Sequence, residues 1–413
     1  MNSAISKSTQ SLTTAEDMRN QTKLIMQPYA NWEEYLTPAP LSIAIMGELV
    51  FISSSTDFSI NKNPPKGGFK FIRYPDSFRA CLMQVCNSGW HAFNEAHTSM
   101  DQIRLHTAQV PNYMKTAVKI LFQGNDEVVK AHLPDQLDNI RVIADECLKL
   151  SDATEKRFTE VIKIVQELEK IAIEQIIAQL NSKRQTYEKC VENLENNQKE
   201  LTEILVTMRN WELEEIDFKT TIEMLIKGMD AMGRVKEQWE KMVHFFQMVS
   251  NIVKTSLSKT LINFVSTSEK TQALSYDGKL FSKDLLYFQA FQISNITCLV
   301  HMISATYTDV SSKYLMDRVS SLGKLMAMNK SKPEFEHERK LLQNGCDEAQ
   351  RGILRLVLKN KDEYDKKSIA RLERIDQELL AILPAAPPEE IRSIQEAVQA
   401  GFNDEEEAAA AYI

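Results

Sequence analysis

The chain has 413 residues but only 12 glycines and 12 prolines, and this scarcity of turn-forming residues disfavours an all-β fold. Its net charge of −8 at pH 7 argues against a general nucleic-acid-binding surface, which is normally basic. Its six cysteines are scattered without the spacing of a zinc site or a disulfide framework. We therefore expect a largely helical protein that does not bind nucleic acid.

The N-terminal residues 1–27 are rich in Ser, Thr and Gln and lack the apolar segment of a secretory signal. We expect this segment to be flexible or weakly helical. No run of about 18 or more apolar residues appears along the chain, so no permanent transmembrane helix is expected. These features predict a cytoplasmic protein, or one released without a classical signal peptide.

Residues 28–75 differ from the rest of the chain because they hold six of the twelve prolines. Residues 41–53 form an apolar run whose length suits either a strand or a short buried helix. A loop and a short extended piece follow, with basic side chains between aromatic ones. This piece is either a solvated hairpin packed on the other helices or a contact site for phosphate or lipid headgroups, through Lys62, Lys66, Lys70 and Arg73.

A helix is predicted over residues 76–110, with Asp76 or Ser77 as its N-cap. Pro111 should end or kink this helix, because proline lacks the amide donor and clashes with the preceding turn. A second helical piece should then run to residue 123 and stop at Gly124, which suits a left-handed C-terminal cap.

No proline occurs between Pro134 and Pro333, and apolar residues recur there at steps of three and four. This pattern predicts an antiparallel bundle of long amphipathic helices at about residues 135–209, 235–270, 281–328 and 334–383. The first of these would span roughly 110 Å if it is continuous, and a helix of that length must pair with others. Asn196 and Asn197 are its weakest point.

Residues 210–233 are interpreted as the tip of a helical hairpin, because Gly228 and Gly233 permit a turn. A connection that faces water normally carries polar side chains, yet this segment is rich in apolar ones. Apolar surface at an exposed end predicts contact with another segment, a partner or a bilayer. The residues proposed to face a membrane or partner are Trp211, Phe218, Ile222, Leu225, Ile226, Met229 and Met232.

The later helices have weaker local signals. The pair Asp277 and Gly278 predicts a turn, and residues 285–308 carry no charged side chain, which suits a helix in the centre of a bundle. Ser331 and Glu334 form a capping box at the start of the last long helix. Prolines then separate the bundle (residues 76–383) from a short helix and an acidic tail in residues 384–413.

The predicted fold class is therefore all-α. We expect an elongated antiparallel bundle of very long helices, with a small irregular or β-hairpin element near the N-terminus. The segments are a flexible N-terminus (1–27), a Pro- and Gly-containing segment (28–75), the bundle (76–383) and the C-terminal helix and tail (384–413).

The sequence contains no nucleotide-binding or hydrolase motif. His91 and Glu95 would share one face of a helix, but His97 lies six residues beyond His91 and points elsewhere. A metal site there would need ligands from other segments. We therefore expect a non-enzymatic protein without a cofactor or metal.

The long proline-poor helices and the final bundle helix resemble the α-helical pore-forming toxins of the cytolysin A and xenorhabdolysin type. The most specific local similarity is at residues 238–253, where a tryptophan precedes apolar residues every three or four positions. The resemblance implies a protein or subunit that changes from a soluble to a membrane-bound form and is a homo- or hetero-oligomer when active. Those toxins insert a hydrophobic tongue or hairpin, whereas residues 210–233 are interrupted by acidic side chains.

The alternative function is an intracellular coiled-coil scaffold or adaptor that presents long helical faces to protein partners. A pore-forming protein needs its apolar tip shielded in the soluble form, and residues 41–53 can supply that shield. A scaffold would release no dye from liposomes and would copurify with a protein partner.

Overall fold

The computed structural model describes residues 15–54, 57–61, 64–196, 201–274 and 276–382. Every regular element in these ranges is a helix, which confirms the all-α prediction for the described part of the chain. The elements are α2 (Ala15–Met26), η1 (Gln27–Tyr29), α3 (Glu33–Leu36), α4 (Ala39–Ile52), α5 (Phe78–Gln123), α6 (Asp126–Asn196), α7 (Leu201–Asn251), η2 (Ile252–Ser258), α8 (Lys259–Gln272), α9 (Tyr276–Val310), η3 (Ser311–Leu315), α10 (Met316–Ala327), α11 (Pro333–Lys366) and α12 (Ser368–Leu380).

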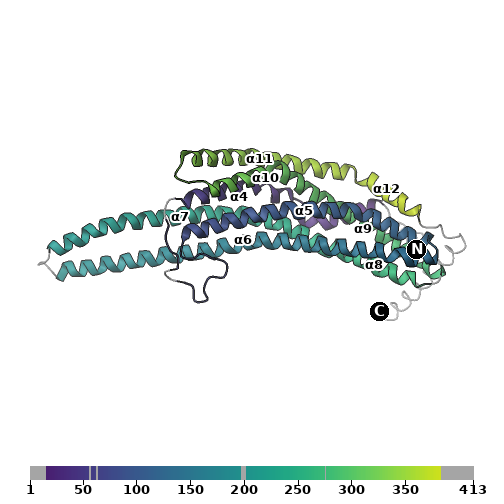
Figure 1. The fold of residues 1–413 in the computed structure, drawn as a ribbon, viewed down its shortest axis with the longest axis horizontal. Coiled ribbons are helices and arrows are strands. Elements are labelled where there is room, and N and C mark those ends of the chain that lie inside the picture. Colours follow the sequence, from purple (N-terminus) through teal and green to yellow (C-terminus); the bar gives the residue numbers. More distant parts are fainter. Residues whose placement is uncertain (1–14, 55–56, 62–63, 197–200, 275, 383–413) are drawn as a thin grey trace, which may run out of the picture.

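The molecule is elongated, with its long helices side by side along the longest axis (Figure 1). α6 contacts both α5 and α7, and α9 contacts α5. α4, α10 and α11 contact one another and lie over one part of these long helices (Figure 1). At one end the last part of α6, up to Asn196, and the first part of α7, from Leu201, extend as a pair beyond the other helices, and we call this pair the arm. α8 and α12 lie toward the opposite end.

Local capping signals decide where α5 begins. The side-chain oxygen of Ser77 accepts a hydrogen bond from the Ala80 amide at 3.0 Å, which makes Ser77 the N-cap. α5 then continues through Pro111 to Gln123, so the expected break at Pro111 is wrong. Contacts with α6 and α9 along its length hold this helix together although proline removes one hydrogen bond.

The start of α6 also differs from the prediction. Gly124 ends α5 in an extended conformation with φ −78°, not in the left-handed one. Asn125 then caps α6, because its side-chain oxygen accepts a hydrogen bond from the Val128 amide at 2.9 Å. α6 therefore begins at Asp126 and includes Pro134, which was expected to open it.

The N-terminal segment contains no strand at its described positions, so the β-hairpin expected within residues 28–75 is wrong there. Residues 41–52 belong to α4, which buries apolar side chains on all sides. A helix satisfies its own backbone hydrogen bonds, whereas a strand at this buried position would need a partner strand. The part between α4 and α5 is irregular, and we call its described residues (57–61 and 64–77) the N-terminal loop.

Residues 210–233 lie inside α7, so their assignment to a hairpin tip is wrong. Gly228 and Gly233 do not interrupt the helix, since a helical glycine costs only about 1 kcal/mol relative to alanine. A Cβ at Gly228 would lie 3.0 Å from the Phe78 ring, so the missing side chain permits close contact with α5. α6 ends at Asn196, where weakness was predicted, while Asn197 lies outside the described residues.

Later helix boundaries depend on packing as well as on local signals. The predicted turn at Asp277 and Gly278 is wrong, because both residues belong to the first turn of α9. The Ser331 capping box is also wrong: Lys332 is the N-cap of α11 without a side-chain hydrogen bond, and Pro333 occupies the first turn. The C-terminal helix and tail predicted in residues 384–413 lie outside the described residues.

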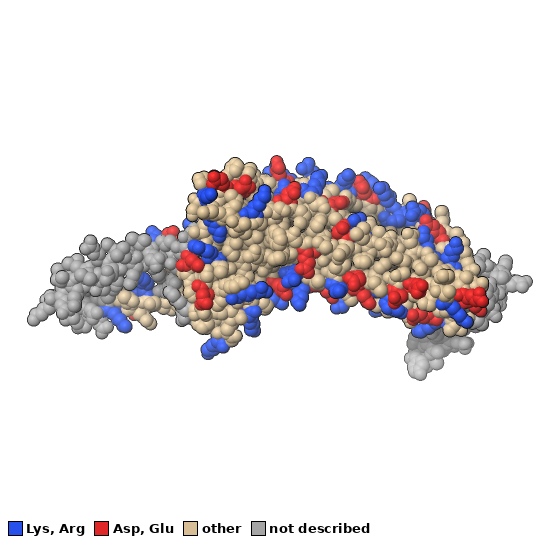
Figure 2. All heavy atoms as spheres, viewed as in Figure 1, with Lys and Arg blue, Asp and Glu red and all other residues tan. Residues whose placement is uncertain are grey.

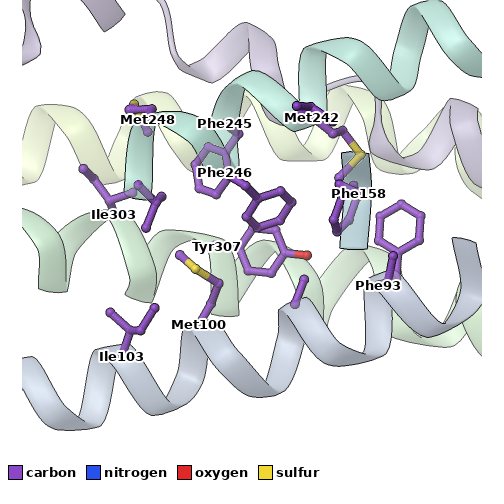
Figure 3. Close-up of a cluster of buried hydrophobic side chains, with 14 of the residues drawn as sticks. Phe93, Met100, Ile103, Phe158, Met242, Phe245, Phe246, Met248, Ile303 and Tyr307 are labelled. Carbon is purple, nitrogen blue, oxygen red and sulfur yellow. The ribbon is translucent and has the colours of Figure 1, made fainter. Parts of the chain in front are cut away.

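A cluster of buried aromatic side chains joins α5, α6, α7 and α9 (Figure 3). Trp239 stacks on Phe158 with ring centres 4.9 Å apart, and its Nε1 donates a hydrogen bond to the Phe158 carbonyl oxygen at 2.9 Å. Phe245 and Phe246 reach Tyr307 of α9 with ring centres 5.6 and 5.4 Å apart. These contacts between aromatic side chains fix α7 against α6 and α9.

The uncharged stretch of α9 also lies in this core. Phe291, Ile296, Leu299 and Ile303 are all buried, which confirms the prediction that residues 285–308 hold a central helix. In the middle of the bundle, away from the arm, the buried residues are therefore those that the apolar pattern of the sequence predicts.

Candidate membrane- and partner-binding surfaces

Within the described residues, one helical stretch is long and apolar enough to cross a membrane, Glu33–Ile52, which comprises α3 and α4. It has 20 residues and is largely buried. A core helix of a soluble protein can have the same length and composition. Composition alone therefore does not distinguish a membrane span from a core helix. The contacts around α4 describe its role in this structure.

α4 is enclosed by α5, α7, α10 and α11. A Cβ at Gly47 would lie 3.0 Å from Cδ2 of Leu342 on α11. A Cβ at Gly89 of α5 would lie 2.4 Å from the Met46 sulfur. These distances leave no room for larger side chains, so both neighbouring helices approach α4 closely at its middle.

Two buried thiols lie against the backbone of α4. Cys86 of α5 donates a hydrogen bond to the Met46 carbonyl oxygen, with the sulfur 3.3 Å away, and the Cys346 sulfur of α11 interacts with the Ala44 backbone. Burial raises the pKa of the Cys86 thiol and of the Cys346 thiol to about 12. Because the thiolate is the reactive form, both cysteines should be unreactive while α4 stays in place.

The basic residues predicted to contact headgroups lie on the N-terminal loop. Lys66, Lys70 and Arg73 are exposed, and Lys62 lies outside the described residues. Phe71 and Tyr74 are 38% and 56% exposed on the same loop. The structure therefore brings basic and aromatic side chains together at the surface, as the sequence suggested, but on an irregular segment.

Glu167 of α6 holds the N-terminal loop against the bundle. Its Oε1 accepts a hydrogen bond from the Lys70 amide at 2.7 Å. Its Oε2 accepts hydrogen bonds from the Phe71 and Ile72 amides at 2.7 and 2.9 Å. One carboxylate thus satisfies three successive backbone donors, and hydrogen bonds to a charged acceptor are among the stronger ones.

Replacing Glu167 with glutamine should loosen the N-terminal loop without unfolding the bundle. The amide keeps one accepting oxygen but loses the charge, and hydrogen bonds to charged groups contribute about 1.5–3 kcal/mol. The amides of Lys70, Phe71 and Ile72 should exchange faster in hydrogen–deuterium exchange. Glu174→Gln, at an exposed position on the same helix, should leave their exchange unchanged. Equal exchange in both variants would show that Glu167 does not hold the loop.

A groove of about 750 Å³ lies between the N-terminal loop and α6. Its wall carries both signs of charge: Arg157 pairs with Glu160 at 3.6 Å, and the Lys163 Nζ lies 5.7 Å from the centre of the Phe71 ring. Basic and acidic side chains are likewise interspersed over the face seen in Figure 2. The groove suits a headgroup that carries both charges better than a strongly anionic one.

Two of the seven residues proposed for the tip lie in the core. Leu225 and Met232 are both buried. α7 packs here against α4 and α6, and Nη2 of Arg234 forms an ion pair with Glu48 of α4 at 2.9 Å. Leu225 and Met232 therefore stabilise the bundle and cannot face a membrane while the bundle is intact.

Among the other five residues, the three whose side chains are described differ in exposure. Ile222 and Met229 are partly buried, and Ile226 is 54% exposed. Trp211 and Phe218 belong to α7, but their side chains lie outside the described part of the structure. The predicted apolar tip is thus a helix with one side in the core, since helical spacing distributes these positions around the axis.

Sequence analysis missed an exposed apolar stripe on α6. Ile173, Ile177, Leu180 and Tyr187 are 46, 52, 51 and 67% exposed. Their spacings of four, three and seven residues place them on one face of the helix. Ala172 is buried, and the core stripe of α6 appeared to continue past it in the sequence. In the sequence, the exposed apolar residues could be recognised only as a second apolar face beside the core stripe of α6.

The histidine and glutamate pattern on α5 is used in contacts with other helices. Glu95 pairs with Arg157 of α6, and Nδ1 of His97 lies 3.0 Å from Oγ of Ser311. No group of three or more His, Cys, Asp and Glu side chains arranged to hold a metal ion occurs among the described residues. These contacts give both side chains a role in joining helices.

Comparison of the chain with protein-family models, with curated proteins and with solved structures finds no match in any of the three. No family is therefore assigned. The resemblance to α-helical pore-forming toxins stays a hypothesis that rests on the pattern of helices, and the function has to be inferred from the surfaces described above.

Proposed function

We propose that this chain is a non-enzymatic bundle protein that changes from a soluble form to a membrane-bound form, as a protein or subunit similar to the α-helical pore-forming toxins. One observation supports this most directly. The stretch Glu33–Ile52 has the length and composition of a membrane span and is enclosed by four helices. The proposal requires that α4 leave the bundle when the protein meets lipid.

The connection between α4 and α5 supports such a movement. The chain between Ile52 and Ser77 would reach roughly 80 Å if extended, so α4 can travel far while α5 stays in place. The described part of this connection has no regular structure, and its hold on α6 includes the three amide hydrogen bonds to Glu167. Release of the N-terminal loop would free one end of α4.

Enclosure of α4 in the described structure also fits a soluble form. Most apolar side chains of α4 are covered by its neighbours, although Phe51 is 42% exposed, and Glu48 forms an ion pair with Arg234 of α7. Departure of α4 from the bundle would expose α4 itself and the surface of α7 that it covers. That surface includes Leu225 and Met232 if α4 is the helix that buries them. Such surfaces can enter lipid or join copies of the chain in an oligomer.

The alternative function is an intracellular scaffold or adaptor, and one observation favours it. The exposed apolar stripe of α6 (Ile173, Ile177, Leu180 and Tyr187) is accessible without any conformational change. It lies on the pair of helices that forms the arm and its base. An apolar stripe at positions three and four apart is the surface that a partner helix recognises. In this alternative α4 is a permanent core helix.

Thiol labelling in the presence of liposomes tests the proposal. Liposomes of phosphatidylcholine and phosphatidylglycerol should increase the rate at which N-ethylmaleimide labels Cys86 and Cys346, because departure of α4 uncovers both. Cys147 of α6 is a matched internal control, since burial also raises the pKa of its thiol to about 12. Peptide mass spectrometry measures the three sites in one sample.

Two results would count against the proposal. If the protein does not float with liposomes and labelling is unchanged at all three cysteines, the scaffold function is favoured. If the protein floats with liposomes while Cys86 and Cys346 stay protected, it binds membranes without moving α4. Faster labelling of Cys147 as well would indicate general unfolding at the lipid surface.

A further inference from the structure

A different kind of site lies between α5, α9, α11 and α12 and is open to solvent. It is a cavity of about 370 Å³, which we call the α9 cavity. This volume falls within the range of small-molecule sites, about 300–1,000 Å³. α12 lies toward the end of the molecule opposite the arm (Figure 1), so this cavity is separate from the surfaces considered above.

Three residues of the wall of the α9 cavity each carry one buried polar atom that lacks a hydrogen-bond partner among the described residues. These atoms are Oγ1 of Thr297, Oη of Tyr364 and Nε of Arg371. Thr297 is only 1% exposed. A buried polar group without a partner costs about 1–3 kcal/mol, so such atoms are rare and seldom gather.

Arg371 determines the charge of the α9 cavity. No Asp or Glu is part of the described wall, and the Arg371 guanidinium forms no ion pair with a carboxylate of the described residues. It lies over the Tyr364 ring, 4.1 Å from the ring centre. In contrast, Arg374 of the same helix pairs with Glu378 at 3.2 Å. A planar guanidinium without a partner matches the two oxygens of a carboxylate.

Other parts of the wall are apolar. Pro111 and Met302 both belong to it. Nδ1 of His301 lies 3.0 Å from the Arg104 carbonyl oxygen, and because a carbonyl only accepts, this nitrogen carries a proton. This hydrogen bond connects His301 to α5. Since a histidine side chain is never negatively charged, it adds no negative charge to the wall. The cavity thus combines one cation with an apolar side.

A neighbouring cavity of about 210 Å³ enlarges the available space. It lies between α2, α9, α11 and α12 and shares Met302, Tyr364 and Arg371 with the α9 cavity. Trp32 and Leu372 supply much of its apolar wall. A molecule held at Arg371 can therefore extend an apolar chain along either cavity.

We propose that the α9 cavity binds a monocarboxylate with an apolar chain of medium length. The carboxylate accepts hydrogen bonds from the Arg371 guanidinium. The chain lies against Pro111 and Met302. This site does not depend on the membrane proposal, because α4 takes no part in its wall.

Calorimetric titration with three probes tests the chemistry of the ligand. Octanoate should bind, octan-1-ol should bind much more weakly because it lacks the charge, and inorganic phosphate should bind much more weakly because it lacks the chain. Absence of octanoate binding overturns the proposal. Equal affinity for octanol would show an apolar pocket only, and equal affinity for phosphate would show a general anion site, so either result overturns it as well.

Variants of α12 test the role of Arg371. Arg371→Gln should weaken octanoate binding roughly ten- to a hundredfold, because it removes a charge-assisted pair. Arg374→Gln is the matched control, since Arg374 is outside the wall, and it should leave the affinity unchanged. Equal weakening in both variants would indicate a diffuse positive field and overturn the proposal.

A third measurement needs no variant and so avoids any loss of folding. Cys298 belongs to the wall of the α9 cavity, whereas Cys147 does not. Octanoate should slow the alkylation of Cys298 by N-ethylmaleimide and leave that of Cys147 unchanged, as measured by peptide mass spectrometry. Equal rates with and without octanoate, or equal protection of both cysteines, overturn the assignment.

Discussion

A disulfide bond between α4 and α11 is expected to abolish dye release from liposomes, and its reduction is expected to restore it. In the variant Gly47→Cys and Leu342→Cys, the new Cβ at position 47 lies 3.0 Å from the former Leu342 Cδ2 position. Position 47 therefore faces the Leu342 side chain, and a disulfide forms if the two Cβ atoms come within about 3.5–4.5 Å of each other. The bond holds α4 in the bundle, so Glu33–Ile52 cannot reach lipid.

The reduced form of the same variant is the matched control, since the two forms differ only in the bond. Cys346 lies one turn from Leu342 and would compete for the new thiol, so the variant also carries Cys346→Ala. Peptide mass spectrometry verifies the bond before the assay. Release of trapped dye at the same rate by both forms would show that α4 need not leave the bundle.

Replacing Trp239 with alanine is expected to lower the free energy of unfolding by about 3–5 kcal/mol, the usual range for a buried tryptophan. The substitution removes a fully buried ring from between Phe93 and Phe158 and leaves a cavity. It also removes the hydrogen bond from Nε1 to the Phe158 carbonyl oxygen. Denaturant unfolding followed by circular dichroism measures the change.

Two comparisons make the Trp239 result specific. Trp239→Phe keeps an aromatic ring and loses the hydrogen bond, so its effect should be clearly smaller. Tyr187→Ala removes an aromatic side chain that is 67% exposed on α6, and its effect should stay within about 0.5 kcal/mol. A loss below about 1 kcal/mol for Trp239→Ala would contradict the central role of the aromatic cluster.

Several helix boundaries were predictable because a local signal decides them. Ser77 has the side chain that caps α5, and the uncharged residues 285–308 need a buried environment. Pro111 and Pro134 were misleading, because a proline removes one hydrogen bond while contacts with neighbouring helices extend over the whole helix. Local signals therefore placed the start of α5 and the weak point at Asn196, but not the starts of α6 and α9.

The candidate surfaces were less predictable than the helices. The basic residues of the N-terminal loop were identified, but Glu167, which holds that loop, is more than ninety residues away in the chain. The exposed stripe from Ile173 to Tyr187 has the same spacing as a core stripe. The α9 cavity joins residues of four helices, so no single segment of the sequence indicates it.

The amino-acid order by itself establishes an all-α protein with long helices. The apolar spacing and the scarcity of glycine and proline are properties of each helix on its own, so they can be recognised without the tertiary structure. Which apolar face is buried, and by what, follows only from the tertiary structure. By length and composition residues 41–53 suit a strand or a short buried helix equally, and enclosure by α5, α7, α10 and α11 makes residues 41–52 a buried helix here. The physical reason is that burial depends on neighbours distant in sequence, whereas periodicity records only that a face is apolar.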